Sequence, residues 1–594
     1  MPRPVLLVVL LAAACTSAVT PSASVDADGA AGGVLRAGIW VPEEADDQWQ
    51  MALLDPQAFM WHPLFRCCLL RTLLSYRGVS ILEGGAQLQP DLAEAMPQVS
   101  ADGLTWTFRL RDGLTYAPPL AERAILARDF ITALERAIRR GESPYHDVID
   151  GVQAFRDGEA DTIAGVQAPD DLTLVFRLNE PIGDFANRVA MHYLAPIPEE
   201  ALRQHDEEYA GHLVASGPYM LEGADTIALS DPDAGPIWEG RPLGELTLVR
   251  NPSWSRDLDP LRPTYVDRIE IVPIRDRGSA SRAIQDGEID LFLDGLFADE
   301  YAEVAADPTL RPRLREAPFA NLFFIPLNLA QPPFDDVAVR RAVNLVVDRQ
   351  SLLGTFDPQR GAAFAPAAHL FPEVSVGGLL RDYVPAAAST DGRSNVAGAR
   401  EEMTRSGYDT DGDGRCDGSA CTIVANRYGP TTDSAVEILA ANLAEIGIEV
   451  SWVDEPVMWD PTAHVALMAI LGWTADYPSA NDFAGLLTEP APDALNLSLV
   501  GATSDQLASW GYDEADVPSV DDKIASCQSR GGSAAFACWA ELDQLLMEQV
   551  VPWVPIATSV GAWLVSDRID RFEIAGSSAD PALERITLRT ETLP

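Results

Sequence analysis

The sequence predicts a mixed α/β protein with at least two domains. Its 594 residues exceed the size at which one hydrophobic core stops growing. Segments with alternating apolar and polar residues are interleaved with segments whose apolar residues recur at helical spacing. The chain also lacks internal sequence repeats. These observations favour strands and helices that alternate along the whole chain.

The expected elements follow from this periodicity. A strand is expected at Leu104–Leu110, which alternates faces and lies between two Asp-Gly turn signals. A helix is expected within Ala124–Arg140, where Ile125, Phe130 and Ile138 recur at roughly helical spacing. Further strands are expected at 172–178, 246–249, 269–274 and 448–453, and a further helix at 436–446.

The N-terminus has the pattern of an export signal. Arg3 is followed by an apolar run from Val5 to Ala14, which is too short to span a membrane. The junction Ala12-Ala-Ala-Cys15 resembles the lipobox of bacterial lipoproteins, with Ala12 where that pattern more often has Leu. The alternative is an ordinary signal peptide cleaved nearby. Both interpretations place the mature protein outside the cytoplasm, and residues 16–33 are expected to form a disordered tether.

Composition excludes several classes of function. A formal net charge of −46 is incompatible with the usual binding of nucleic acid and argues against docking onto anionic lipids. The sequence contains no His-x-x-x-His pair, no Gly-x-Ser-x-Gly turn and no phosphate-binding loop with Lys. We therefore expect a protein that is not an enzyme and that requires no cofactor.

The seven cysteines suggest oxidised pairs in an exported protein. After Cys15, six remain, and six cysteines allow 15 pairings. Short spacing in polar surroundings favours two local disulfides. The adjacent Cys67 and Cys68, in an apolar stretch, are expected to be buried thiols. The predicted disulfides join Cys416 to Cys421 and Cys527 to Cys538.

An acidic loop offers a possible structural calcium site. Asp409, Asp411 and Asp413 alternate around a Gly turn, and Asp417 follows, as in the first half of a calcium loop. Position twelve is Ala420, so the loop is not an EF-hand. The alternative is a solvated surface turn.

Eight short segments form a series in a fixed order. They include Leu88–Pro97, Asp102–Gly113, Ser216-Gly-Pro-Tyr219, Pro333–Ala342 and Gly472-Trp-Thr-Ala-Asp-Tyr-Pro478. Together they resemble the extracytoplasmic solute-binding proteins of ABC importers, in the peptide/nickel (oligopeptide- and dipeptide-binding) family. The resemblance runs from about residue 35 to residue 572. One departure is Ala215-Ser216, where the family usually has Gly-Thr.

The resemblance implies a two-lobed fold of the periplasmic-binding-protein type (class II), with an extra domain inserted in the first lobe. Two crossing segments would join the lobes, and ligand would be captured between them. Mapped onto this chain, residues 1–15 form the lipoprotein signal peptide and 16–33 the tether. Lobe I would comprise 34–60, 206–318 and 549–594, the inserted domain 61–205, and lobe II 319–548.

The resemblance also suggests residues that bind ligand. In peptide-binding relatives, the aspartate at the position of Asp476 pairs with the ligand's α-ammonium, and a cation moved into a closed cleft needs such a fixed carboxylate. The alternative is a turn aspartate that binds backbone N–H groups. Trp473 and Trp40 could supply flat apolar walls, or could be core residues. Arg427 is a candidate for the ligand's carboxylate.

The expected function is therefore that of a lipid-anchored substrate-binding subunit of an ABC importer. Its partners would be a short peptide or peptide-like solute and the membrane permease subunits, and we expect a monomer. Within the same class, a nickel complex, a sugar or another solute is the alternative. Two other classes stay open: a secreted hydrolase with an unrecognised carboxylate site, and an exported interaction lipoprotein that does not transport.

Overall fold

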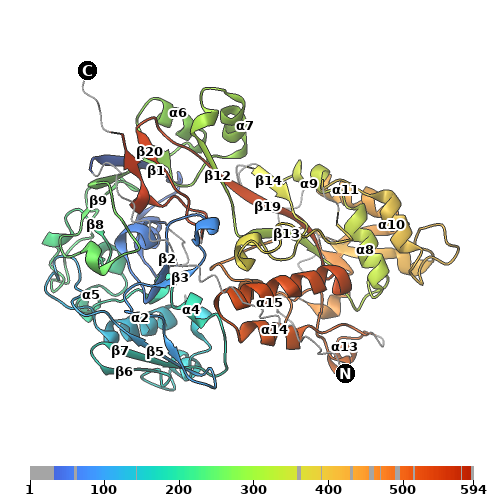
Figure 1. The fold of residues 1–594 in the computed structure, drawn as a ribbon, viewed down its shortest axis with the longest axis horizontal. Helices are drawn as coiled ribbons and strands as arrows, with labels where there is room; N and C mark the ends of the chain where they lie inside the picture. Colours follow the sequence, from blue (N-terminus) through green and yellow to red (C-terminus); the bar gives the residue numbers. More distant parts are fainter. Residues whose placement is uncertain are drawn as a thin grey trace, which may run out of the picture.

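A computed structural model shows two lobes joined by crossing strands (Figure 1). It describes residues 32–58, 63–141, 144–356, 363–388, 391–427, 433–453, 460–468, 470–488, 496–512, 516–576 and 578–589. The predicted signal segment and Cys15 lie outside the described residues. No helix in the described part of the chain is both long and apolar enough to cross a membrane.

Lobe I is built on a mixed five-stranded sheet in the order β11-β1-β10-β9-β8. β1, β10 and β11 are parallel, so their carboxyl ends meet at one edge of the sheet. Buried Leu35, Ala37 and Ile39 of β1 face the core. The strands are β1 (Val34–Trp40), β8 (Tyr219–Leu221), β9 (Leu246–Arg250), β10 (Arg268–Ile274) and β11 (Leu291–Phe292).

The inserted domain contains an antiparallel sheet in the order β4-β5-β7-β6. Trp106 and Phe108 of β5 face the core, as their alternation requires. One continuous hydrophobic core includes this domain and the sheet of lobe I. The elements are β4 (Gln98–Val99), β5 (Thr105–Arg109), β6 (Val166–Asp170), β7 (Thr173–Arg177) and α2 (Ala127–Arg140).

Lobe II has its own core and two sheets. β12 (Leu314–Pro318) and β13 (Asn321–Pro326) both pair with β19 (Trp553–Leu564), and this antiparallel ribbon runs between the lobes (Figure 1). The same sheet holds β14 (Ala363–Pro366) and β18 (Leu471–Thr474). A parallel sheet in the order β16-β15-β17 consists of β15 (Thr422–Asn426), β16 (Glu449–Val453) and β17 (Leu467–Met468).

The remaining elements surround these sheets. They are α1 (Asp47–Leu54), β2 (Leu74–Tyr76), β3 (Leu88–Pro90), α3 (Val152–Arg156), α4 (Phe185–Arg188), α5 (Glu199–His205), α6 (Ala280–Gln285), α7 (Ala298–Ala306), α8 (Val337–Val346), α9 (Arg349–Leu353), α10 (Val396–Met403), α11 (Asp433–Ala444), α12 (Asn481–Ala484), α13 (Ser504–Ser509), α14 (Asp521–Gln528), α15 (Gly532–Leu545), β20 (Ile569–Arg571) and β21 (Thr587–Leu588).

The strand and helix predictions are confirmed. The expected strands correspond to β5, β7, β9, β10 and β16, and the expected helices to α2 and α11. α2 starts three residues later than the predicted segment, because Asp129 accepts a hydrogen bond from the Leu126 backbone N–H (2.8 Å) and so caps the first turn. The predicted domain boundaries stay predictions.

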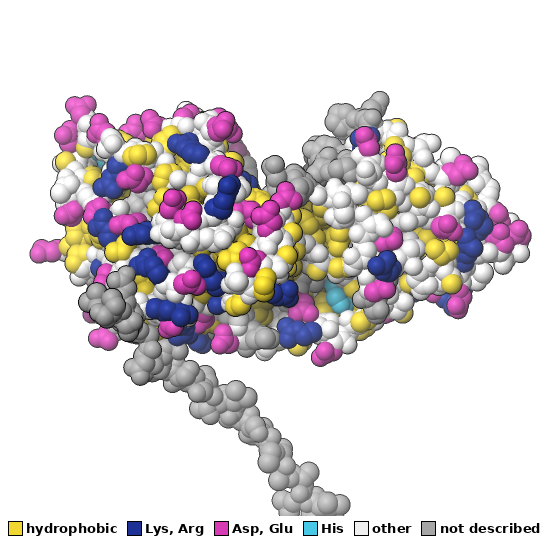
Figure 2. Space-filling view, turned by 90° about the horizontal axis from the view of Figure 1, so that it is seen from above, with side chains coloured by type: hydrophobic (Ala, Val, Ile, Leu, Met, Phe, Trp, Pro, Cys, Tyr) yellow, Lys and Arg dark blue, Asp and Glu magenta, His cyan; other side chains and the backbone are white. Residues whose placement is uncertain are grey.

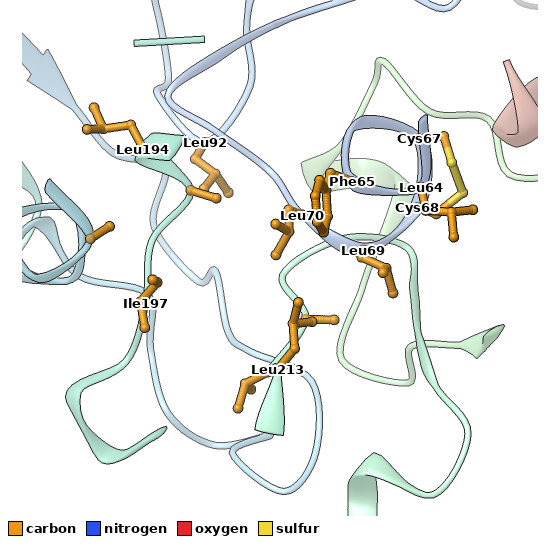
Figure 3. Packing of buried hydrophobic residues seen from close by; sticks show 14 of the residues in the cluster. Leu64, Phe65, Cys67, Cys68, Leu69, Leu70, Leu92, Leu194, Ile197 and Leu213 are labelled. Carbon is orange, nitrogen blue, oxygen red and sulfur yellow. A yellow bond between two sulfur atoms is a disulfide. The ribbon is translucent and has the colours of Figure 1, made fainter. Parts of the chain in front are cut away.

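Both predicted disulfides are present, joining Cys416 to Cys421 and Cys527 to Cys538. The prediction of free thiols at Cys67 and Cys68 is wrong, because these adjacent residues form a third disulfide (Figure 3). The local backbone explains the difference. Phe65–Leu69 form a π-helical turn, and this departure from regular helix lets the two neighbouring side chains converge.

The turn that contains this disulfide also explains why position 217, in the Ser216-Gly-Pro-Tyr219 segment, is a glycine. A Cβ atom placed on Gly217 would lie 2.3 Å from the Cys68 carbonyl oxygen. Only glycine permits the strand that leads into β8 to approach the π-helical turn this closely. The Ser216-Gly-Pro-Tyr219 segment therefore has a packing role in the core of lobe I.

Candidate functional site between the lobes

The surface is hollowed between the two lobes (Figure 2), and the inserted domain meets lobe II on one side of the molecule. The contact segment of lobe II follows β18 and continues into α12. Tyr477 of this segment packs with Met191 and Tyr193 of the inserted domain in a small apolar cluster. Residues far apart in the sequence therefore form one site.

Asp476 lies in this contact. Its side chain is half-buried and accepts a hydrogen bond from the hydroxyl of Tyr145, which comes from the inserted domain. No Arg, Lys or His of the described residues pairs with the Asp476 carboxylate. Burial raises the pKa of Asp476, and the hydrogen bond from Tyr145 partly opposes this rise. The site thus contains a carboxylate that is withdrawn from water without a neutralising cation.

A second carboxyl group lies directly beside it. Asp482 accepts hydrogen bonds from the Trp473 indole N–H (3.0 Å) and from the Asp476 backbone N–H (3.2 Å). Burial, followed by the nearby charge of Asp476, raises the pKa of Asp482 to about 8. At pH 7 Asp482 is therefore mainly protonated.

Polar contacts hold the inserted domain against lobe II. The buried Asp184 accepts hydrogen bonds from the Tyr477 hydroxyl (2.7 Å) and from the Asn481 side chain, and it pairs with Arg188 (3.3 Å). The backbones also approach closely, since a Cβ on Gly183 would lie 2.0 Å from the Gln528 carbonyl oxygen. We call the Asp184–Tyr477–Asn481 contacts the interdomain latch.

A small cavity adjoins Asp476. Its volume is about 40 Å³, and Tyr477 and Pro478 of lobe II line it together with Arg66 and His192 from the other side. A water molecule needs roughly 10–15 Å³, so the cavity has room for about three waters. A peptide is too large for this cavity. Binding one here would require Tyr145 to separate from Asp476.

The other predicted residues lie in different surroundings. Trp473 packs against the core of lobe II and is oriented by Asp482, so it belongs to the same site as Asp476. Trp40 ends β1 in lobe I and packs on the cluster beside the crossing strands. Arg427 follows β15 and forms an ion pair with Asp433. Neither Trp40 nor Arg427 hydrogen-bonds to Asp476.

In the acidic loop, Asp409, Asp411 and Asp413 have carboxylate oxygens within 4.8 Å of one another. Asp417 instead accepts hydrogen bonds from the backbone N–H and hydroxyl of Thr410 (2.9 and 2.6 Å). Both Asp409 oxygens also accept backbone N–H groups. Three of the four predicted ligands are thus together, and the calcium site stays a prediction.

Sequence reasoning missed Asp184, Asp482 and Tyr145. Asp482 lies six residues after Asp476, but nothing in the sequence distinguishes it from the other acidic residues of so acidic a chain. Its role depends on burial and on the Trp473 indole. Asp184 and Tyr145 come from the inserted domain, so their proximity to lobe II is purely tertiary.

The fold and this interlobe site define a class, the solute-binding proteins. The family described as "Bacterial extracellular solute-binding proteins, family 5 Middle" matches residues 87–494. This match covers more than half of the chain, and the protein belongs to that family. It is therefore a non-enzymatic substrate-binding component of an ABC importer and works outside the cytoplasm.

Individual comparisons show how broad the family is. The chain is 28% identical to the probable deoxycholate-binding periplasmic protein of Escherichia coli over 284 residues, 46% of this chain and 48% of that one. It is 23% identical to heme-binding protein A of Haemophilus influenzae, covering 83% of each chain. The solved structure of clavulanic acid biosynthesis oligopeptide binding protein 2 has a TM-score of 0.71 at 24% identity, covering 94% of this chain and 96% of that one, and shows the fold.

Proposed function

We propose that this protein captures short peptides, or peptide-like solutes with a free amino group, and delivers them to a membrane permease. The observation that carries the proposal is Asp476. It is a carboxylate at the interlobe contact, half-buried, and bound by a neutral hydroxyl rather than by a cation. A ligand ammonium supplies the charge that this desolvated group lacks.

The neighbouring groups support an ammonium partner. Asp482 is mainly neutral at pH 7, so a single positive charge matches the site. The Tyr145 hydroxyl donates a hydrogen bond to the Asp476 carboxylate. This hydroxyl can move away from Asp476 as the lobes separate. Trp473 is held beside the pair by its bond to Asp482 and provides an apolar wall. Ligand contacts from both lobes would then favour closure through their differential affinity.

The test compares peptides with free and acetylated amino groups. Purified protein is incubated with a pool of random di- to tetrapeptides in both forms, and the retained species are quantified by mass spectrometry. Wild-type protein should prefer the free amine. Asp476→Asn should lower affinity for it by about 30-fold or more, which is typical when one partner of a desolvated charge pair is removed.

A matched control separates this effect from a general loss of charge. Asp505 is exposed in the first turn of α13, and Asp505→Asn should leave peptide retention unchanged. If wild-type protein retains no peptide of either form, the peptide proposal is wrong. If it retains both forms equally, the ammonium role of Asp476 is wrong.

Names of the relatives favour a second candidate ligand class. One relative is named for deoxycholate and another for heme, and both ligands are large, apolar and anionic. A solute of this kind would rely on apolar walls rather than on the Asp476 carboxylate. Mass spectrometry of whatever co-purifies with the protein discriminates the two, because a steroid, a porphyrin and a peptide differ in mass and fragmentation.

We further propose that the mature protein is anchored through a lipid on Cys15 and acts as a monomer. The Ala12-Ala-Ala-Cys15 junction supports the anchor. A tether of about 18 residues has a root-mean-square span of roughly 20–25 Å. That reach would let the two lobes dock on the permease while the lipid stays in the membrane.

A further inference from the structure

Arg277 in lobe I has surroundings that are unusual for an arginine. Its guanidinium carbon lies 3.3 Å from the centroid of the Trp40 ring and 4.7 Å from that of Phe297. The side chain is half-buried, and its Nε atom is buried without a hydrogen-bond partner. No Asp or Glu of the described residues forms an ion pair with it. Both rings lie within cation–π distance of the guanidinium, and no acceptor among the described residues takes a hydrogen bond from its N–H groups.

The position of Arg277 matters because of the sheet. Trp40 ends β1 and Ile274 ends β10, and these parallel strands share a carboxyl edge. In open α/β sheets, ligands bind in the crevice outside the carboxyl ends of the strands. Arg277 follows β10 by three residues and therefore lies at this edge. The adjoining apolar cluster contains Leu564 of β19, so the edge is next to the crossing strands.

A cavity of about 480 Å³ opens at this edge. Trp40 and Arg277 line it together with Arg275, and Glu43, Glu44 and Asp276 complete the lining. Arg275 already donates to the Pro42 carbonyl oxygen (2.8 Å). The three acidic side chains are exposed, so solvent screens their charges far more than that of the half-buried Arg277.

The side chain of Asp294, which is exposed, already has a hydrogen-bond partner nearby. Asp294 accepts a hydrogen bond from the Trp40 backbone N–H (2.9 Å). Desolvation by the surrounding protein raises the pKa of Asp294, and the charge of Arg277 opposes this rise without a direct contact. Burial likewise lowers the pKa of Arg277. Asp294 thus holds the end of β1 in place and leaves the guanidinium N–H groups of Arg277 available to a ligand.

We infer that Arg277, held between Trp40 and Phe297, is a carboxylate-binding subsite of lobe I that receives an anionic end of the ligand. A planar guanidinium binds a carboxylate through two parallel hydrogen bonds, and stacking fixes its plane before the ligand arrives. The inference rests on the proposed function. It also replaces Arg427, which is paired with Asp433, as the candidate for this role.

The two subsites together define the ligand chemistry. Asp476 in lobe II takes a cation and Arg277 in lobe I takes an anion, so a zwitterion bridges the lobes. The exposed Glu43, Glu44 and Asp276 around Arg277 favour a ligand whose other polar groups are donors, as the N–H groups of a peptide are. This arrangement makes the ligand itself an electrostatic link between the two halves.

The experiment uses the same random peptide pool in two forms, with a free carboxyl terminus and with a carboxyl-terminal amide. Wild-type protein should prefer the free acid. Arg277→Gln should lower affinity for the free acid by about 10- to 100-fold, the range expected for hydrogen bonds between charged groups, and leave affinity for the amide nearly unchanged. Arg277→Lys should fall between the two, since it keeps the charge and loses the fork.

Arg282→Gln is the control, because Arg282 is an exposed arginine on the neighbouring helix α6. It should behave like wild type. If Arg277→Gln keeps the wild-type preference for the free acid, the inference is overturned while peptide binding stands. If wild-type protein retains no peptide, the proposed function fails and the inference falls with it. A melting temperature for each variant distinguishes lost affinity from lost folding.

Discussion

The half-buried Asp476 and the buried Asp482 beside it lead to a specific prediction about stability and pH. Asp482→Asn keeps an oxygen that can accept from the Trp473 indole and the Asp476 backbone N–H, so the local hydrogen bonds survive. What the substitution removes is a carboxyl group whose ionisation is opposed by burial and by its neighbour. The variant therefore isolates the electrostatic cost of ionising Asp482.

The direction in which pH changes the stability of the fold follows from proton binding by Asp482. The pKa of Asp482 rises from 3.8 in the unfolded chain to about 8 in the fold. Between these values the folded state holds a proton that the unfolded state releases, so stability falls as pH rises. With about 1.4 kcal/mol for each pKa unit, this one group costs about 4 kcal/mol at pH 7. Between pH 5 and pH 8 the wild-type protein should lose about 3–4 kcal/mol from this cause.

The assay is urea denaturation at pH 5 and pH 8, followed by tryptophan fluorescence, for wild-type protein and Asp482→Asn. The variant should be more stable than wild type at pH 8, with a much smaller difference at pH 5. Hydrogen exchange over residues 471–487 should show the same pH dependence locally. Asp505→Asn serves as the exposed control. Equal pH dependence in the variant and the wild type would refute the reasoning.

Three further predictions follow. Tyr477→Phe removes one hydrogen bond of the interdomain latch and leaves the buried Asp184 with one donor fewer, so it should lower the free energy of unfolding by about 1–3 kcal/mol. Small-angle scattering should show larger dimensions for the free variant than for the free wild-type protein. Unchanged dimensions would contradict this. Calcium should raise the melting temperature of wild-type protein but not of Asp411→Asn, and a lack of response in both would exclude the site. Cys15→Ser should release the protein from membranes, as measured by fractionation, and continued membrane association would contradict lipid anchoring.

Local patterns were enough to predict the regular elements. β5 and β7 alternate apolar and polar residues between strong turn signals, and α2 carries its apolar residues at helical spacing. These patterns are set by residues close in sequence. The packing of lobe I and the inserted domain on one common core could not be predicted in this way, because it depends on contacts between distant segments.

The candidate site was only partly predictable. Asp476 and Trp473 stand in one short segment that the family resemblance marks. The choice of Arg427 had little support, because Lys523 is the only lysine and nearly every positive charge is therefore an arginine. What distinguishes Arg277 is its closeness to two aromatic rings and, within the described part of the chain, the lack of an ion pair with an acidic residue. Both are tertiary properties, as is the neutral state of Asp482.

β19 has a mechanical consequence, because a single strand belongs to both halves of the molecule. Trp553 at its start lies in the core of lobe II, and Leu564 at its end packs in lobe I. Its partner changes from β13 to β12 around Ser559. Cross-strand bonds oppose sliding, so a swing of the two halves would bend β19 at this short stretch, which also pairs with β14. A substitution that stiffens this stretch would therefore reduce how far the two lobes open before ligand binds. It would leave the ligand contacts of each lobe unchanged.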